Sequence, residues 1–321
     1  MFWLKGGIMD SLQFQHLIAA LGELTEVQRQ TVAAILCGHG ELAEVTSVIE
    51  ARFGAQILCP YCKSMNVGSW GRACGLKRYR CRECRKSFNA LTGTPLARLR
   101  KREAWKTYAQ AVAESVSVRK AAQRTGVSVP TAFRWRHRFL SLAKDAKAKT
   151  VSGIVEADET FFLKSFKGVR KMSRAPRKRG GVARKRGASD EQVPVLVLRD
   201  RSGATTDAVL QNLKVTEIYR VLTPAVAKDT VLVSDGARAY ASFAFEAGIG
   251  HVGLTGRRGE RRRGVFHIQN VNAYHSRLKT WMRRFNGVAT KYLPNYLGWR
   301  RMFEREGDRV SAQRCLLAAL A

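Results

Sequence analysis

The chain has 321 residues, 45% hydrophobic and 26% charged, which is enough for about two or three ordinary globular domains. It carries 57 Lys and Arg against 25 Asp and Glu, and a net charge of +32 indicates a polyanionic partner, with nucleic acid as the leading candidate. No apolar run could cross a membrane, no secretory signal is evident, and seven cysteines in such a chain argue against a disulfide framework.

Residues 1–54 are predicted to form a helical N-terminal segment. Apolar residues recur there at helical spacing, first from Leu12 to Leu36 and again after a break at Gly38. The pattern leaves two roles open, which are binding DNA and packing on the module that follows.

Residues 55–92 contain two Cys-x2-Cys pairs separated by 18 residues, Cys59 with Cys62 and Cys81 with Cys84. This spacing is typical of a structural zinc site, in which four thiolates complete a tetrahedron and leave no position open for catalysis. The alternatives are two incidental pairs or a redox Cys-x-x-Cys. Short β-leaning runs around the second pair favour a zinc ribbon.

Residues 100–145 are predicted to form a helix-turn-helix DNA-binding domain. Helical patterns lie on both sides of Gly126, and Ser128 is placed to cap the second helix of the motif. An ordinary helical hairpin with a solvated basic face is the alternative. The residues that could reach phosphates or guanine edges in a major groove are Arg134, Arg136 and Arg138.

Residues 151–305 are predicted to form a new domain in which β and α patterns alternate. An apolar run at 151–162 predicts a strand that carries Asp158, and a run at 230–234 predicts a strand that ends at Asp235. Each aspartate taken alone is more typical of a turn at a strand end, but two of them in so basic a chain suggest one metal site. Further strands are expected at 193–198, 204–210 and 251–254, helices at 216–222, 238–247, 271–285 and 296–303, and a C-terminal tail at 306–321.

A basic insertion at 164–189 holds 11 Lys or Arg and no acid. It cannot bury a core, and we expect it to contact DNA phosphates without sequence preference, although charge runs are often only solvated. The contact residues expected within it are Arg177, Lys178, Arg179, Arg184, Lys185 and Arg186.

The late helix presents two polar residues beside an apolar stripe. Asn272 and Lys279 are seven residues apart, which is about 10 Å along a helix, so an amide oxygen and an ammonium group share one face. They could complete a metal and phosphate site, although both residue types are common at such positions. The stripe itself, with spacings of 3, 4, 3 and 4, consists of Val271, Tyr274, Leu278, Trp281 and Phe285.

Together these features resemble bacterial insertion-sequence transposases, in the zinc-ribbon group of the DDE superfamily. The resemblance covers roughly residues 55–305 and implies an RNase H-like α/β catalytic domain, with a mixed sheet and flanking helices, behind a zinc ribbon and a helix-turn-helix. Its specific parts are the cysteine pattern and the stretch 270–299, supported by the runs 157–160 and 234–236. By its motif, the catalytic residues would be Asp158, Asp235, Asn272 and Lys279.

The resemblance implies a transposase that binds the ends of its insertion element and performs metal-dependent cleavage and strand transfer. Asp158, Asp235 and Asn272 would hold Mg²⁺ or Mn²⁺ for phosphoryl transfer, and the four cysteines would hold Zn²⁺. Asn272 stands where the commoner pattern has a third carboxylate, and the group accepts Asn there. The partners would be double-stranded DNA, as element ends and target, and further copies of the chain on that DNA, in the cytoplasm at the bacterial nucleoid and not at a membrane.

Three alternatives remain open at this point. The chain could be a non-catalytic zinc-ribbon and helix-turn-helix DNA-binding regulator, an RNase H-like nuclease such as a resolvase, or an inactive transposase copy. A metal-dependent cleavage assay separates the regulator from the enzymes, and a preference for branched DNA over specific ends identifies the resolvase.

Overall fold

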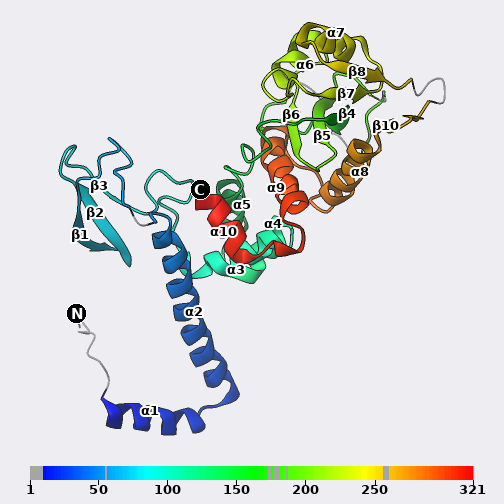
Figure 1. Cartoon of the computed structure of the whole chain (residues 1–321). Coiled ribbons are helices and arrows are strands. Elements are labelled where there is room, and N and C mark those ends of the chain that lie inside the picture. The colour runs from blue at the N-terminus through cyan, green and yellow to red at the C-terminus, as the bar shows by residue number, and fades with distance from the viewer. Residues whose placement is uncertain are drawn as a thin grey trace. The chain divides into compact units, whose positions relative to one another are not determined.

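The computed structural model describes residues 10–54, 56–172, 175, 181–185, 187–255 and 260–320 (Figure 1). These residues fall into two compact units, one formed by Met1–Ala90 with Leu99–Lys106 and the other by Leu91–Arg98 with Thr107–Ala321. None of the helices in the described ranges is both long and apolar enough to span a membrane.

The first unit begins with two helices that carry their own start signals. Helix α1 (Ser11–Gly22) follows Asp10 and α2 (Glu26–Ala51) follows Thr25, and each of these side chains accepts the backbone N–H three residues on. A glutamine at that third position returns a bond to the cap residue in both cases, which completes a capping box. The 3-10 turn η1 (Arg102–Ala104) packs on α2.

A small antiparallel sheet completes the first unit, with strands β1 (Val67–Ala73), β2 (Leu76–Cys81) and β3 (Ser87–Asn89) in that order. Its core is the buried ring of Phe88, which meets the Phe53 ring edge-on at 5.9 Å. Three strands this short bury little apolar surface, so the sheet needs another source of stability.

The helix-turn-helix region forms as expected. Ser117 and Ser128 cap its second and third helices through the N3 backbone amides, and Gly126 ends the second helix in the left-handed conformation at φ 62°. The bounds of the three helices are α3 (Trp105–Ala113), α4 (Val118–Thr125) and α5 (Val129–Phe139).

The second unit is built on a five-stranded mixed sheet with the order β6-β5-β4-β7-β8. The three strands β4, β5 and β6 are antiparallel neighbours, whereas β7 and β8 run parallel to β4. This arrangement is RNase H-like and confirms the expected fold class. The strands are β4 (Ile154–Leu163), β5 (Gln192–Asp200), β6 (Thr205–Val209), β7 (Val231–Ser234) and β8 (Gly250–Gly253).

Alternation along β4 sends its side chains to two helical layers. Val155 packs into the apolar core beneath α6 (Val215–Leu222) and α7 (Arg238–Ala247). Asp158 lies on the other face, toward α8 (Gln269–Arg283). The strand therefore presents Val155 and Ala157 to the apolar core under one layer and Asp158 to the other layer.

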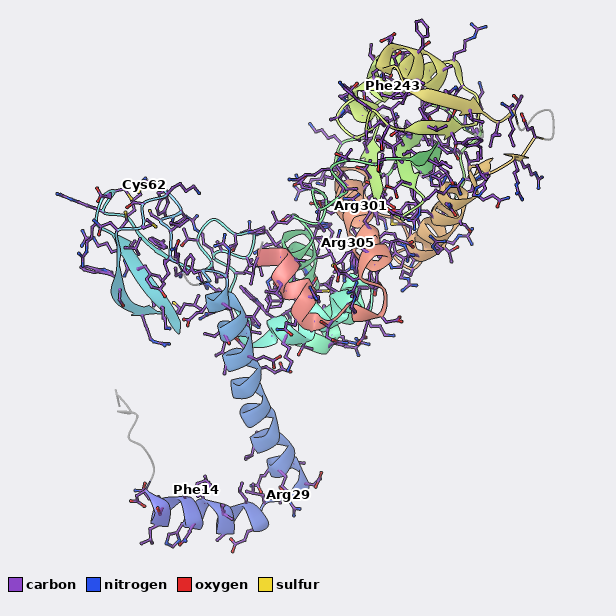
Figure 2. All side chains as sticks on the ribbon, viewed as in Figure 1. Phe14, Arg29, Cys62, Phe243, Arg301 and Arg305 are labelled. Atoms are coloured by element: carbon purple, nitrogen blue, oxygen red, sulfur yellow. The ribbon has the colours of Figure 1, made fainter. Side chains whose placement is uncertain are left out.

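The segment between the helix-turn-helix and the sheet is held by α9 (Leu293–Glu306). Arg301 of α9, labelled in Figure 2, donates to the carbonyls of Ala143 and the next residue and forms a buried ion pair with Asp207. Gly298 lies so close that an added Cβ would stand 2.1 Å from the carbonyl oxygen of Ala143. The bridge between the two motifs is thus a packed part of the second unit.

The C-terminal residues differ from the expected tail. They form α10 (Ala312–Leu320), which packs on α5 and buries Cys315 and Leu316. A nine-residue helix with an apolar face is stabilised by such packing and not by its own propensity. The remaining short elements are β9 (Arg262–Arg263), β10 (Phe266–His267), η3 (Thr290–Tyr292) and η4 (Gly307–Arg309).

Candidate metal and nucleic-acid sites

The four cysteines of the two Cys-x2-Cys pairs come together in the first unit. The Sγ atoms of Cys59 and Cys84 are 3.6 Å apart, as are those of Cys62 and Cys81, and all four atoms lie within 4.8 Å of one another. A zinc tetrahedron with Zn–S bonds of about 2.3 Å has sulfur–sulfur edges of about 3.8 Å. The cluster therefore has the donor atoms and the spacing that zinc requires.

The backbone builds both cysteine pairs in the same way. Cys59 N donates to Ser64 O at 2.9 Å and Cys81 N donates to Lys86 O at 3.0 Å, so each pair closes a turn of equal length. The residue after each second cysteine, Lys63 or Arg85, is left-handed at φ 63° or 56°. Two equivalent turns that aim their thiols at one point are a structural reason to treat the cluster as built for a metal. Cys74 is exposed and does not belong to the cluster.

In the second unit, the strand register brings the backbone at Asp158 close to the backbone at Asp235. Ile154 pairs with Val231 and Glu156 with Val233 in the parallel β4–β7 ladder, and two more residues on each strand lead to the two aspartates. Neighbouring strands are about 4.8 Å apart. The two side chains thus start from neighbouring backbone positions near the centre of the sheet, Asp158 within β4 and Asp235 directly after β7.

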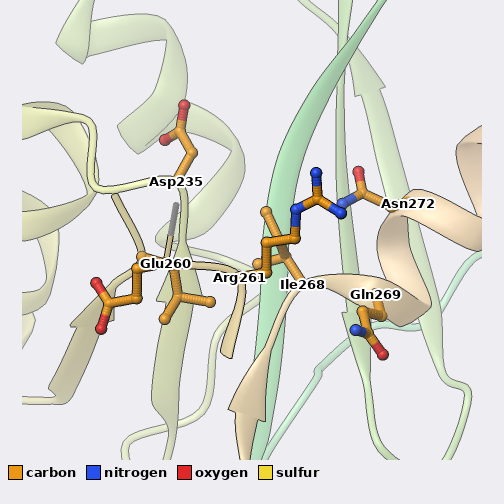
Figure 3. Close-up of a pocket in the computed structure, with 7 residues that line it drawn as sticks. Asp235, Glu260, Arg261, Ile268, Gln269 and Asn272 are labelled. Carbon is orange, nitrogen blue, oxygen red and sulfur yellow. The ribbon is translucent and has the colours of Figure 1, made fainter. Parts of the chain in front are cut away.

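Asp235 and Asn272 line one cavity of about 370 Å³ (Figure 3). Asp235 follows β7 directly and is exposed, whereas Asn272 lies on the first turns of α8 on the other side of the cavity. Figure 3 also shows the guanidinium group of Arg261 pointing toward the carboxamide of Asn272. The complete lining consists of Asp235, Leu254, Glu260, Arg261, Ile268, Gln269 and Asn272.

His275 is a site residue that the sequence analysis did not identify. It lies three residues after Asn272 on α8, and its Nδ1 is 3.5 Å from Oδ2 of Asp158. Its Nε2 is buried and has no hydrogen-bond partner among the described residues. The spacing of His275 from Asn272 could have indicated it, because residues three apart share a helix face. Lys279 is exposed one turn further along α8.

Glu159 points to the other face of β4, as alternation predicts, and accepts a hydrogen bond from the hydroxyl of Tyr240 on α7. Burial raises the pKa of Glu159, the bond from Tyr240 opposes this, and the charges of Asp158 and Asp235 raise the pKa further. The carboxyl group of Glu159 is thus within electrostatic range of both aspartates, although it lies on the face of β4 opposite to Asp158.

The three arginines of the recognition helix α5 have different environments. Arg134 is exposed. Arg138 is exposed as well, but it donates to the carbonyls of Pro95 and Ala97. Arg136 is fully buried.

The position of Arg136 corrects its expected role as a DNA contact. Its guanidinium group stacks 4.6 Å from the centre of the Trp299 ring and donates to Val116 O at 2.8 Å. Arg136 therefore joins α5 to the core and cannot reach a DNA groove from this position.

The basic insertion is described only in part. Arg184 and Lys185 are both exposed, and the backbone N–H of Arg184 donates to Glu191 at 2.7 Å. The other four residues expected to contact DNA there lie outside the described residues, namely Arg177, Lys178, Arg179 and Arg186.

Comparison with known proteins gives matches in both motif-bearing regions. Residues 150–300 match the family described as ISXO2-like transposase domain, and residues 99–145 match the homeodomain-like domain family. A curated relative, an uncharacterized protein in transposable element ISH50 of Halobacterium salinarum, is 27% identical over 252 residues, which are 77% of this chain and 85% of the relative. The crystal structure of a pre-cleavage Mos1 transpososome aligns with 93% of this chain and covers 99% of the Mos1 chain at 11% sequence identity. The TM-score of this alignment is 0.17, which is too low to indicate a shared fold.

Proposed function

The chain is an insertion-sequence transposase of the DDE type, with its transposase domain at residues 150–300 behind a helix-turn-helix, and from this premise we propose that it binds the ends of its own element and cuts and joins DNA there. The observation that carries the proposal is the parallel register of β4 and β7, whose last pair, Glu156 with Val233, lies two residues before Asp158 and Asp235. Asn272 adds a third oxygen donor from α8 across the cavity that Asp235 lines.

The donor set fits a hard divalent cation. Two carboxylates and one carboxamide oxygen are ligands that Mg²⁺ accepts, and the remaining positions would be filled by water and DNA phosphate. When bound, the metal activates the attacking oxygen and stabilises the leaving oxygen of an in-line phosphoryl transfer. We assign Asp158, Asp235 and Asn272 to holding it and Lys279 to contacting a nearby phosphate.

Binding of the element ends is assigned to the helix-turn-helix and the four-cysteine module. Arg134 is the recognition-helix guanidinium that is exposed without a backbone partner among the contacts of the described residues. The described part of the insertion contributes exposed Arg184 and Lys185, which suit phosphates of flanking or target DNA. Because transposition joins two ends, we propose that the active form on DNA is a homo-oligomer.

The test is cleavage of a labelled DNA that carries the element's own ends, with Mg²⁺, with Mn²⁺ and with EDTA. We expect nicking at the element end that requires metal and is absent in Asp158→Ala, while end binding is kept. Asp229→Asn is the matched control, because Asp229 is exposed just before β7, at the end of that strand opposite Asp235. Wild-type nicking by the Asp158 variant would refute the assignment of Asp158. End-specific binding without cleavage in either metal would favour the regulator or an inactive copy.

A further inference from the structure

A second acidic residue of β4 is completely buried on the same face as Asp158. Glu156 has no exposed surface and lies two residues before Asp158, about 6.6 Å along the strand. Its carboxylate accepts hydrogen bonds from Asn270 Nδ2 and from Val271 N, each at 2.9 Å. It also lies 3.0 Å from Nη1 of Arg201. A buried carboxylate is costly unless partners compensate it, and this one is fully compensated.

Glu156 supplies a hydrogen-bond acceptor to the N-terminus of α8, where the N-cap side chain supplies none. The helix starts at Gln269, and its N-cap residue, Ile268, makes no side-chain capping bond. The first backbone N–H groups of a helix have no partner within the helix, and its N-terminal end favours a negative charge. Glu156 meets both needs from the neighbouring strand. The start of α8 is therefore capped from the sheet by Glu156 at Val271 N, in addition to the bond that Gln269 N donates to His267 Nδ1 at 3.3 Å.

Arg201 ties this contact to the rest of the second unit. Its Nη1 lies 2.7 Å from Nε2 of His267, and its Nη2 donates to Val265 O at 2.9 Å. His267 Nδ1 is itself 3.4 Å from the carboxylate of Glu156. The turn after β5 and the short β10 strand therefore close around the same carboxylate.

We propose that Glu156 is a positioning residue that sets α8, and with it Asn272 and His275, at the correct distance from Asp158. The inference rests on the proposed function, in which Asn272 helps to hold the metal. A neutral carboxamide is drawn to a cation less strongly than a carboxylate, so the position of Asn272 depends on where its helix is held. Asn272 is two residues from the bonded Asn270, about 3 Å along the helix axis.

The first test uses Glu156→Gln, which keeps the shape of the side chain and removes its charge. The amide can accept only one of the two bonds from α8 and presents a donor to the other. We expect faster hydrogen–deuterium exchange of the backbone amides in residues 268–276, measured without metal or DNA. We also expect the Mn²⁺ concentration for half-maximal end cleavage to rise by about 10-fold or more, the usual effect of losing a group that orients a metal ligand.

Two further variants separate positioning from general loss of stability. Glu304→Gln removes a carboxylate that binds Arg277, further along α8, at 2.8 and 2.9 Å, and we expect it to leave exchange at 268–276 and the Mn²⁺ midpoint unchanged. The double variant Glu156→Gln with Asn270→Asp reverses donor and acceptor in the side-chain pair. It also places a carboxylate in the first turn of α8, so we expect it to restore much of both readouts.

The outcomes distinguish this inference from the proposed function. Faster exchange at 268–276 in a protein that never cleaves DNA would support the positioning role and count against the catalytic proposal. Unchanged exchange, or an unchanged Mn²⁺ midpoint in an otherwise active variant, would overturn the positioning role alone. If Glu156→Gln does not fold, Asn270→Ala removes one of the bonds and must shift both readouts in the same direction by a smaller factor.

Discussion

Asp235 at the end of β7 and Asn272 on α8 line the same cavity, one from the sheet and one from the helix that covers it. The two residues bring unequal donors to that space, because a carboxylate carries a charge and a carboxamide does not. A substitution at Asn272 that changes its charge should therefore change the metal affinity of the proposed site.

Replacing Asn272 by Asp should lower the Mg²⁺ concentration needed for half-maximal end cleavage, and replacing it by Ala should raise that concentration. We expect roughly tenfold in each direction, because Asp adds a charge to the proposed ligand set and Ala removes an oxygen ligand from it, and the number and charge of the ligands set the affinity of such sites. Gln269→Glu is the control, since it adds the same charge to the same cavity outside the proposed ligand set. An equal effect of Gln269→Glu would mean that only the net charge of the cavity matters.

Replacing Cys81 by Ser should remove zinc from the purified protein and unfold the small sheet, because the metal contributes folding free energy that three short strands lack. The zinc content per chain and the near-ultraviolet circular dichroism report the two effects. Cys74→Ser should keep both, since that exposed thiol lies outside the cluster. Full zinc content in the Cys81 variant would contradict the assignment.

Arg134 and Arg136 should respond to alanine in opposite ways. Arg134→Ala should weaken binding to an element end by about 1–3 kcal/mol and leave the unfolding temperature unchanged. Arg136→Ala should lower the free energy of unfolding by about 2 kcal/mol through lost packing and the lost stacking on Trp299, with binding by the folded fraction unchanged. Binding titrations and thermal unfolding of both variants measure the two effects. Lower stability of the Arg134 variant together with weaker DNA binding of the Arg136 variant would contradict the assignment.

Replacing Arg301 by Met should lower the free energy of unfolding by about 3–5 kcal/mol, because Asp207 is left as a buried charge without its partner. Adding Asp207→Asn should recover a large part of that loss, since a neutral amide is less costly to bury. Denaturant unfolding of the wild type, both single variants and the double variant measures the coupling. Additive losses would show that the pair does not act as a unit.

The stability of the second unit should fall in mild acid through His137. Burial, and then the positive charges of Arg136 and Lys291, lower the pKa of His137 to about 4, and its ring stacks on Tyr292 with centres 3.5 Å apart. The unfolded chain has a pKa of about 6.5 at this position and binds the proton first. The contribution is therefore complete above pH 6.5 and is lost as the pH falls toward 4.

His137→Phe keeps an aromatic ring against Tyr292 and removes the titration. We expect its unfolding temperature to fall less than that of the wild type between pH 6.5 and pH 4. Parallel curves for the two proteins over this range would assign the acid sensitivity to other groups.

Much of the fold could be predicted from local patterns. The strands that carry Asp158 and Asp235, the helix that carries Asn272 and the four cysteines all follow from spacing, because apolar periodicity and Cys-x2-Cys pairs are visible within a few residues. The cap and turn at Ser128 and Gly126 were equally visible.

The residues missed by the sequence analysis depend on distant partners. Glu156 bonds to residues 114 and 115 positions away, and His275 faces Asp158 from another element. Arg136 lies among other basic residues in the sequence of its helix, and only its contact with Trp299 reveals that it is buried. A buried charge and a solvated one look alike in sequence, because burial is decided by what packs over the residue. For the same reason α10 was expected to be a tail.

The packing of Gly298 and Arg301 against the chain at Ala143 has a consequence for the DNA itself. The recognition helix and the two aspartates belong to one compact unit. The distance and the rotation along the double helix between the bound sequence and the phosphate at the aspartates are then fixed by the protein. One base pair inserted between the recognised sequence and the cut would displace the target phosphate by about 3.4 Å and rotate it by about 35°. Under the proposed function, we therefore expect the spacing of the element ends to be constrained as well as their sequence.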